Sequence, residues 1–288
     1  MNFNPCSFII VFLTNLVKIV SFRAAEMKKL HTYFKLGLIG AAAVATTSSA
    51  SAQVNTLLGG VSEGLSGEIS AGYDSEYFYR GLWFGADNAW TGIDFEKALC
   101  DGVTLSLGAY YLDTLNSGPY SESGISSSIA WDSGVGTFEA GFTHFRFFDG
   151  FDGGGIGQQD ATEFSLGYST NDFYGFSGYV QGVWDVRIDA GYLEAGIAQS
   201  VDFGFASLDL SAALGYSIGD YYVADTDDED DLTHVLVTAA LPIQLLENVT
   251  FTPHVSANIS LGARENANND LGQDDFEVFG GASFAVSF

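Results

Sequence analysis

Basic residues are scarce in this sequence. Its 288 residues include 10 Lys plus Arg against 36 Asp plus Glu, which gives a formal net charge of -26. Recognition of nucleic-acid phosphates depends on clustered Lys and Arg, so this balance excludes nucleic acid as a partner. With 2 cysteines the chain cannot build a disulfide scaffold or a cysteine-rich zinc site. After Gln53 no apolar run reaches the length of about 18 residues that a membrane-spanning helix needs.

The abundant residues indicate a folded chain that is rich in glycine and aromatics. Hydrophobic residues make up 47% of the sequence and aromatic residues 15%, and there are 35 glycines. This hydrophobic fraction is too high for a disordered chain. Length and composition therefore favour a single folded domain with an acidic character.

A targeting segment is predicted near the N-terminus. From Met27 a basic stretch precedes an apolar run at residues 36–45 and the small-residue site Ala50-Ser51-Ala52. This order is typical of a bacterial secretory signal peptide, which we place at residues 27–52. The apolar run is too short to span a bilayer as a helix.

The signal peptide divides the rest of the chain into three segments. Residues 1–26 are interpreted as an over-extended start or a disordered leader, with a membrane anchor as the alternative. Residues 53–65 are expected to be an N-terminal periplasmic segment. Residues 66–288 are expected to form the folded domain.

Apolar and polar side chains alternate with a period of two throughout residues 66–288. At the start, Ile69 and Ala71 are apolar, whereas Glu68 and Asp74 have the opposite parity and are polar. Such alternation is typical of strands with one apolar and one polar face, so we expect an all-β fold of about 12 strands. The predicted strands are 66–79, 88–98, 103–112, 124–131, 135–147, 161–169, 174–184, 189–200, 205–217, 232–241, 248–261 and 276–288.

The predicted connections alternate in length. Tight polar turns are expected at residues 100–102, 132–134 and 202–204, whereas long loops are expected at 113–123, 148–160, 218–231 and 262–275, with a first long loop at 82–88. Short turns on one side and long loops on the other are the pattern of an antiparallel up-and-down transmembrane β-barrel of the bacterial outer membrane. The link at 185–188 is shorter than this pattern prefers.

A secreted β-sandwich is the alternative fold, because its strands also alternate. The polar face here is small and acidic and nearly lacks basic residues, which favours a barrel whose apolar face contacts outer-membrane lipids. Aromatic residues near strand ends are expected to form an interfacial girdle. They are Tyr77, Phe78, Tyr79, Trp83, Phe84, Tyr110, Tyr111, Phe145, Phe147 and Phe148.

The last predicted strand carries an assembly signal. Phe284, Val286 and Phe288 share one face of an alternating strand that ends on an aromatic residue. Strands of this kind are favoured by the assembly machinery of bacterial outer-membrane barrels, which is therefore an expected partner.

The polar face of the strands is predicted to line the lumen. Charges inside a membrane barrel persist only where water or a partner solvates them. The expected lumen-lining residues are Glu68, Asp74, Glu76, Arg80, Asp94, Glu96, Glu139, Glu163, Glu194, Asp209, Glu277, His254, Ser256 and Asn258. Two interpretations stay open: a narrow channel for small polar or cationic solutes, and a packed salt-bridge network that fills a closed barrel.

Two other functions compete with a channel. One is a non-transporting structural or surface-interaction barrel that works through long acidic extracellular loops. The other is a lipid hydrolase, because His254 and Ser256 have a spacing that can juxtapose a base and a nucleophile. Alternation places both residues inside the barrel, away from lipid, so the sequence predicts no enzyme.

No cofactor or metal site is predicted. The acidic run at residues 225–231 offers carboxylates to Ca²⁺ but lacks the glycine of an EF-hand loop, which favours a solvated charge run. The glycine-rich stretch at 153–160 occurs once, whereas calcium-binding glycine repeats need stacked copies. It is expected to be a loop.

Two stretches carry a resemblance to a known family. Gly72-Tyr-Asp-Ser-Glu-Tyr-Phe-Tyr-Arg-Gly81 contains a Tyr-Phe-Tyr-Arg-Gly motif, and residues 232–253 contain Leu-Pro-Ile-Gln-Leu. Together they resemble a family of uncharacterised bacterial outer-membrane barrel proteins over about residues 66–288. The resemblance implies a barrel in the outer membrane and implies no catalytic residues.

Overall fold

The computed structural model describes residues 64–115, 120–148, 160–171, 173–219, 230–262, 264–265 and 274–288. The leader and signal peptide predicted at 1–52, and residues 53–63, lie outside these ranges. Within the ranges, no helix is long and apolar enough to cross a membrane. The strands are β1 (Leu65–Tyr79), β2 (Leu82–Cys100), β3 (Val103–Thr114), β4 (Ser121–Asp132), β5 (Gly136–Phe147), β6 (Ala161–Thr170), β7 (Phe176–Asp185), β8 (Ala190–Asp202), β9 (Ser207–Ile218), β10 (Asp231–Ala240), β11 (Ile243–Leu246), β12 (Val249–Ser260) and β13 (Phe276–Ser287).

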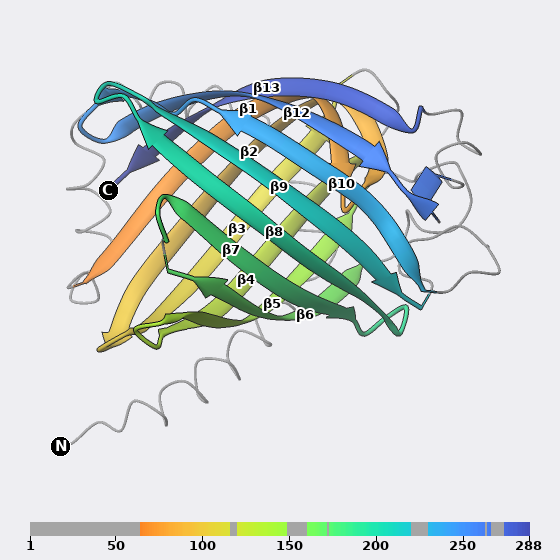
Figure 1. The fold of residues 1–288 in the computed structure, drawn as a ribbon, viewed down its shortest axis with the longest axis horizontal. Coiled ribbons are helices and arrows are strands. Elements are labelled where there is room, and N and C mark those ends of the chain that lie inside the picture. The colour runs from red at the N-terminus through yellow and green to blue at the C-terminus, as the bar shows by residue number, and fades with distance from the viewer. Residues whose placement is uncertain are drawn as a thin grey trace. The chain divides into compact units, whose positions relative to one another are not determined.

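The strands form one closed antiparallel barrel (Figure 1). Successive strands of the wall pair with one another, β1 pairs with β13, and β10 pairs with β12, which closes the cylinder. In the described part of the chain, closure pairs the wall strands on both sides, as a strand-built membrane protein requires; the short β11 pairs with β12 and meets Ala206 in a single bridge. The predicted all-β, up-and-down barrel is confirmed.

Strands β10 and β11 act as one interrupted wall strand. Ala240 at the end of β10 pairs with His254, and Ile243 at the start of β11 pairs with Phe251, both on β12. The interruption falls at Pro242, which has no backbone N–H to donate. Taking β10 and β11 together, the 13 assigned strands make a barrel of 12, as the sequence predicts.

The two ends of the barrel carry different connections. Short links join β2 to β3, β4 to β5, β6 to β7, β8 to β9 and β11 to β12, and we call this the short-turn end. The longer connections after β3, β5, β9 and β12 lie at the opposite, long-loop end. Two tight turns, at residues 80–81 and 186–189, also lie at the long-loop end.

The expectation of a long loop at residues 82–88 is wrong, because β2 begins at Leu82. Arg80 and Gly81 have positive φ angles of 51° and 81°. Two consecutive residues with positive φ make a type I′ turn, whose twist suits a two-residue hairpin. The apolar residues after the turn therefore extend β2 instead of forming a loop.

The outer surface of the barrel is apolar. Leu166 on β6 and Val180 on β7 are 71% and 49% exposed. Near the short-turn end, the rings of Trp131, Phe138 and Tyr168 follow one another across β4, β5 and β6, with centroids 5.8 and 4.7 Å apart. An apolar band bordered by aromatic rings is the lipid-facing surface of a barrel of the bacterial outer membrane.

Adjacent positions on β7 separate the two faces. Val180 points outward and Gln181 inward, because neighbouring residues of a strand alternate. Val180→Arg is expected to lower the free energy of unfolding by about 2–4 kcal/mol, the cost of arginine near the membrane midplane. The matched control, Gln181→Arg, should cost less than about 1 kcal/mol. Urea unfolding in lipid vesicles measures both values, and equal losses would contradict this assignment of faces.

Candidate functional site at the long-loop end

Side chains that meet across the bore identify the inner face. Tyr79 on β1 donates a hydrogen bond to Glu163 on β6, although these strands are not neighbours. Residues that are paired on neighbouring strands point to the same side of the wall. Starting from Glu163, the register therefore identifies the residues of each strand that point into the bore. The register puts these expected lumen residues on that face: Glu68, Asp74, Asp94, Glu96, Glu139, Glu163, Glu194, Asp209, His254, Ser256, Asn258 and Glu277. Glu76 and Arg80 lie near the tip of the β1–β2 hairpin, where Glu76 accepts a hydrogen bond of 2.6 Å from Trp83.

Burial is concentrated at the long-loop end. The buried side chains there include both apolar and charged groups. They are Leu82, Leu112, Tyr120, Glu122, Phe145, Glu163, Val183, Asp185, Tyr192, His234, Asn258 and Arg264. The barrel is therefore filled at this end, and its packed interior is a layer across the mouth.

Two hairpins from opposite walls meet in this layer. The β1–β2 hairpin is separated from the β7–β8 hairpin by β3–β6 on one side and by β9–β13 on the other, so the two face each other. The apolar cluster that joins them consists of Leu82, Val183, Ala190 and Tyr192, with Phe84 and Ile188 packed against it. We call residues 79–84 and 183–192 the clasp. It bridges the bore along a diameter.

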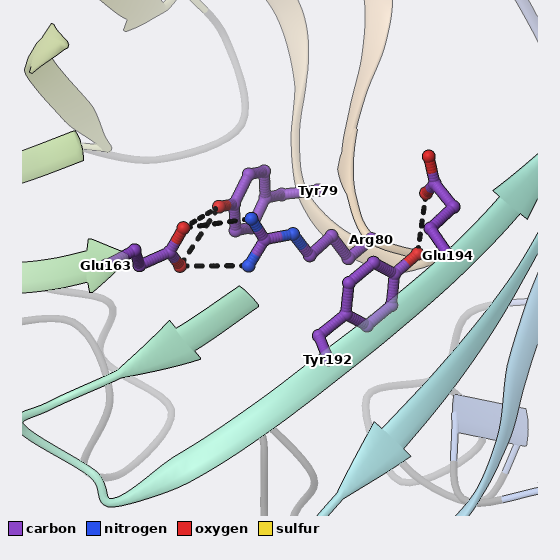
Figure 2. A network of polar contacts seen from close by, with 5 residues as sticks. All are labelled: Tyr79, Arg80, Glu163, Tyr192 and Glu194. Atoms are coloured by element: carbon purple, nitrogen blue, oxygen red, sulfur yellow. Dashed lines mark hydrogen bonds and ion pairs between the residues drawn. The ribbon is translucent and has the colours of Figure 1, made fainter. Parts of the chain in front are cut away.

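Arg80 ties the clasp to β6 (Figure 2). Its guanidinium donates two hydrogen bonds of 2.9 Å to the Glu163 carboxylate, which also accepts one of 3.1 Å from Tyr79. The guanidinium lies 4.5 and 4.9 Å from the ring centroids of Tyr79 and Tyr192, so cation–π attraction adds to the ion pair. Burial acts to lower the pKa of Arg80, but Tyr79 and Glu163 raise it by more, and the group stays charged.

Gly81 lets the turn approach β10. Its φ is 81°, and a Cβ atom at this position would lie 2.6 Å from the His234 ring. Any other residue would therefore be strained and would also displace the facing wall. On the same turn, the Arg80 carbonyl accepts a hydrogen bond of 3.3 Å from Nε of Arg264, which follows β12. This two-residue turn thus contacts β6, β8 and β10 of the wall and the segment that follows β12.

Glu122 organises a second cluster on the β3–β6 side of the clasp. Its carboxylate accepts hydrogen bonds from Tyr77 at 2.8 Å, from Tyr110 at 2.7 Å and from Tyr120. Three hydroxyl donors satisfy this carboxylate. Burial of the same group without hydrogen bonds would cost free energy. The cavity left among these side chains is about 10 Å³, at the lower limit for one water molecule. This side of the mouth is closed to a solute.

The predicted aromatic girdle is wrong for several residues at this end. Phe84 packs 5.3 Å from Tyr120, and Tyr79 packs 5.7 Å from Phe145, measured between ring centroids inside the barrel. The β1–β2 register shifts next to Tyr77, so simple alternation does not assign its side. The expected girdle residues that turn inward here are Tyr77, Tyr79, Phe84, Tyr110, Phe145 and Phe147.

Below the clasp, Asp74 joins three strands of the inner wall. It accepts a hydrogen bond of 2.7 Å from Trp90 and lies 2.9 Å from Nε2 of His254. Gly281 stands between Asp74 and His254 in the register, and a Cβ there would lie 2.3 Å from the Asp74 carboxylate. The glycine is therefore what allows the two side chains to meet.

The hydrolase pair is not assembled. His254 is engaged by Asp74, and the Ser256 hydroxyl lies 2.8 Å from that of Thr238. Among the described residues, no hydrogen bond joins His254 to Ser256. The geometry of a base acting on a nucleophile is therefore not present at this position.

Toward the short-turn end the inner face carries acids and small residues. Glu68 accepts a hydrogen bond of 3.2 Å from Ser287, and Asp209 one of 2.6 Å from Ser200. Glu68 and Asp94 are direct cross-strand neighbours. Adjacent carboxylates repel each other unless water or cations lie between them. The two halves of the bore therefore differ: packed aromatics and ion pairs in one, solvated acids in the other.

Several residues of the mouth layer were not expected from the sequence. Glu122 and Arg264 fall within the predicted loops at 113–123 and 262–275, and His234 lies in the predicted strand 232–241 without being an expected lumen residue. The inward position of Glu122 could have been predicted, because this residue shares the parity of the small residues Gly124, Ser126 and Ser128 on the same strand. Arg264 lies outside the strands, so alternation gives no signal for it.

The remaining expectations concern metals and assembly. In the described part of the chain, no three His, Cys, Asp or Glu side chains are grouped to hold a metal ion. The stretches 153–159 and 225–229 lie outside it.

Phe284 is 51% exposed on the outer face, and Phe288 pairs with Gly67 through backbone hydrogen bonds of 2.9 and 2.8 Å. A role of Phe284, Val286 and Phe288 in assembly stays a prediction.

A double-mutant cycle measures the cross-bore ion pair. Glu163→Gln and Arg80→Gln are each expected to lower the free energy of unfolding by about 3 kcal/mol, because each leaves the other charge buried without its partner. The double variant should cost clearly less than the two single losses together. Arg80→Lys should not restore stability, since lysine lacks the two-pronged donor geometry. Additive losses in urea unfolding would show that the pair is not coupled.

No family model and no curated protein matches the sequence. Solved barrels resemble the structure. The KdgM porin aligns with a TM-score of 0.48 at 10% identity, over 77% of this chain and 99% of that chain. An outer membrane channel from Pseudomonas putida F1 aligns with a TM-score of 0.47 at 7% identity, over 78% and 95%. The NanC porin aligns with a TM-score of 0.46 at 10% identity, over 77% and 98%. The likeness is one of barrel architecture.

Proposed function

We propose that this protein is an outer-membrane channel for small polar or cationic solutes, and that the clasp is its constriction. The observation that carries the proposal is the negative charge of the inner face. The two basic residues within the described strands, Lys97 and Arg146, have the outward parity, since they pair with Leu65 and Ser123. The inward side chains of the described strands, taken together, include many carboxylates.

An acidic lining favours cations over anions. Carboxylates around a pore attract cations and repel anions, and hydroxyls beside them replace part of a solute's hydration. A barrel of 12 strands is wider than the side-chain-filled barrels of about 8 strands and narrower than the large porins of 16–18 strands. Its bore is therefore wide enough for small solutes and narrow enough for two hairpins from opposite walls to meet across it.

The clasp sets where passage is restricted. The β3–β6 side of the mouth is occupied by the Glu122 cluster, so a solute path would run on the β9–β13 side or require the clasp to move. The short-turn half offers solvated acids that would hold cations after entry. Solute selection and restriction would thus occupy different levels of the bore.

A non-transporting barrel is the second candidate, and the same layer favours it. If the clasp never opens, the mouth layer is a stabilising core and the long loops carry the function. The two candidates differ in a measurable property, which is whether ions cross the protein in a planar bilayer.

Charge-removing variants test the cation preference. In a KCl gradient the wild-type protein is expected to give a reversal potential on the cation-selective side. Replacing the acids near the short-turn end, in Glu68→Gln with Asp94→Asn, should lower the K⁺ over Cl⁻ permeability ratio by about two-fold. Glu247→Gln, a matched control in the β11–β12 turn, should leave the ratio unchanged. An unchanged ratio in the double variant would remove these acids from the path.

Loosening the clasp tests the constriction. The double variant Arg80→Gln with Glu163→Gln removes the charged tie and shortens the side chain at residue 80, so the single-channel conductance or the open fraction should rise. Lys97→Gln, on the outer face, is the control and should behave as the wild type. Silence of both the wild-type protein and the double variant, at several voltages, would favour the non-transporting barrel.

A further inference from the structure

A hollow in the inner wall lies below the clasp, on β5, β6 and β7. Its volume is about 170 Å³, room for several non-hydrogen atoms, and it opens into the bore. The inward residues that line it include Glu139, Ser165, Gly167, Ser169, Tyr179 and Gln181. None of them belongs to the clasp.

Gly167 is the reason for the hollow. It stands in a cross-strand row between Glu139 on β5 and Gln181 on β7, and the row continues to Glu194 on β8. A Cβ atom at Gly167 would meet nothing closer than 3.7 Å, so the space above this residue is open. The neighbouring inward residues of β6, Ser165 and Ser169, are small and widen the floor.

The polar groups at the rim of the hollow are available to a ligand. Among the described residues, neither the Glu139 carboxylate nor the Gln181 amide has a hydrogen-bond partner, and both side chains are exposed to the bore. An amide can donate and accept, whereas a carboxylate only accepts. A ligand that fits both must therefore supply donors, and a positive charge if it is to balance the carboxylate.

The opposite rim of the hollow is fixed in place. Tyr179 donates a hydrogen bond of 2.6 Å to Glu194, which accepts a second of 2.7 Å from Tyr192. The Tyr179 ring lies over Gly196, whose Cβ would be 2.4 Å from it. This ring cannot swing into the hollow without losing that bond, so the cavity is preformed, as small-molecule sites usually are.

We infer that this hollow is a binding subsite for a small organic cation, one that carries an ammonium or guanidinium group and a further hydrogen-bonding group. The inference deepens the proposed channel function and rests on it for its biological role. Glu139 holds the positive group, Gln181 and the serine hydroxyls hold the second polar group, and the Glu194 carboxylate in the same row adds attraction. The acidic bore excludes anions from the site.

Binding of agmatine to the purified full-length barrel in detergent micelles tests the subsite. Isothermal titration should detect binding that Gly167→Val and Glu139→Gln each weaken by about ten-fold or more, the first by filling the hollow and the second by removing its charge. Gly178→Val is the matched control, because this glycine of β7 faces outward and also has no atom closer than 3.7 Å to an added Cβ. It should bind agmatine as the wild type does.

The outcomes separate the subsite from the channel. Undiminished agmatine binding in Gly167→Val or Glu139→Gln overturns the subsite, whatever the bilayer currents are. Glucose displacing agmatine at equal concentration overturns the cationic class. Agmatine binding that both variants lose supports the subsite even if the wild-type protein passes no current, in which case the channel proposal fails alone.

Discussion

The ion pair between Arg80 and Glu163 is the contact on which the arrangement of the mouth depends. It joins a turn of one wall to a strand that is not its neighbour, and it does so inside the bore, where each charge would be costly alone. Holding that turn inward brings Leu82 onto the β7–β8 hairpin and Gly81 onto β10. The apolar cluster and the ion pair therefore hold the same turn, and together they make one end of a membrane barrel resemble a protein core.

The scarcity of basic residues determines which groups bind the other carboxylates of the interior. With few basic residues, most inward carboxylates cannot be paired with lysine or arginine, and tyrosine hydroxyls take over that role. Glu122 is satisfied by three tyrosines and Glu194 by two. A hydroxyl satisfies a carboxylate without neutralising it, so the interior keeps its negative sign even where it is fully hydrogen-bonded. Packing and electrostatic selectivity are thus compatible in the same barrel.

Strand limits and faces could be predicted because alternation is a local property of the chain. The parity of Glu139 or Glu194 follows from its immediate neighbours. Contacts across the bore are not local: Leu82 meets Val183 only because a closed barrel makes their hairpins opposite, and no pattern selects Glu163 from the other acids as the partner of Arg80. Tyr77 shows a third limit, since a register shift beside it changes the side on which its ring lies.

The clasp also has a mechanical consequence. A thin-walled cylinder is most easily deformed by flattening, in which one diameter lengthens while the perpendicular one shortens. A tie along a diameter resists that mode, so the cross-section at the long-loop end keeps its shape when the lateral pressure of the surrounding lipid changes. The strain of such a change would then be taken up nearer the short-turn end, along the same wall that contains the hollow over Gly167.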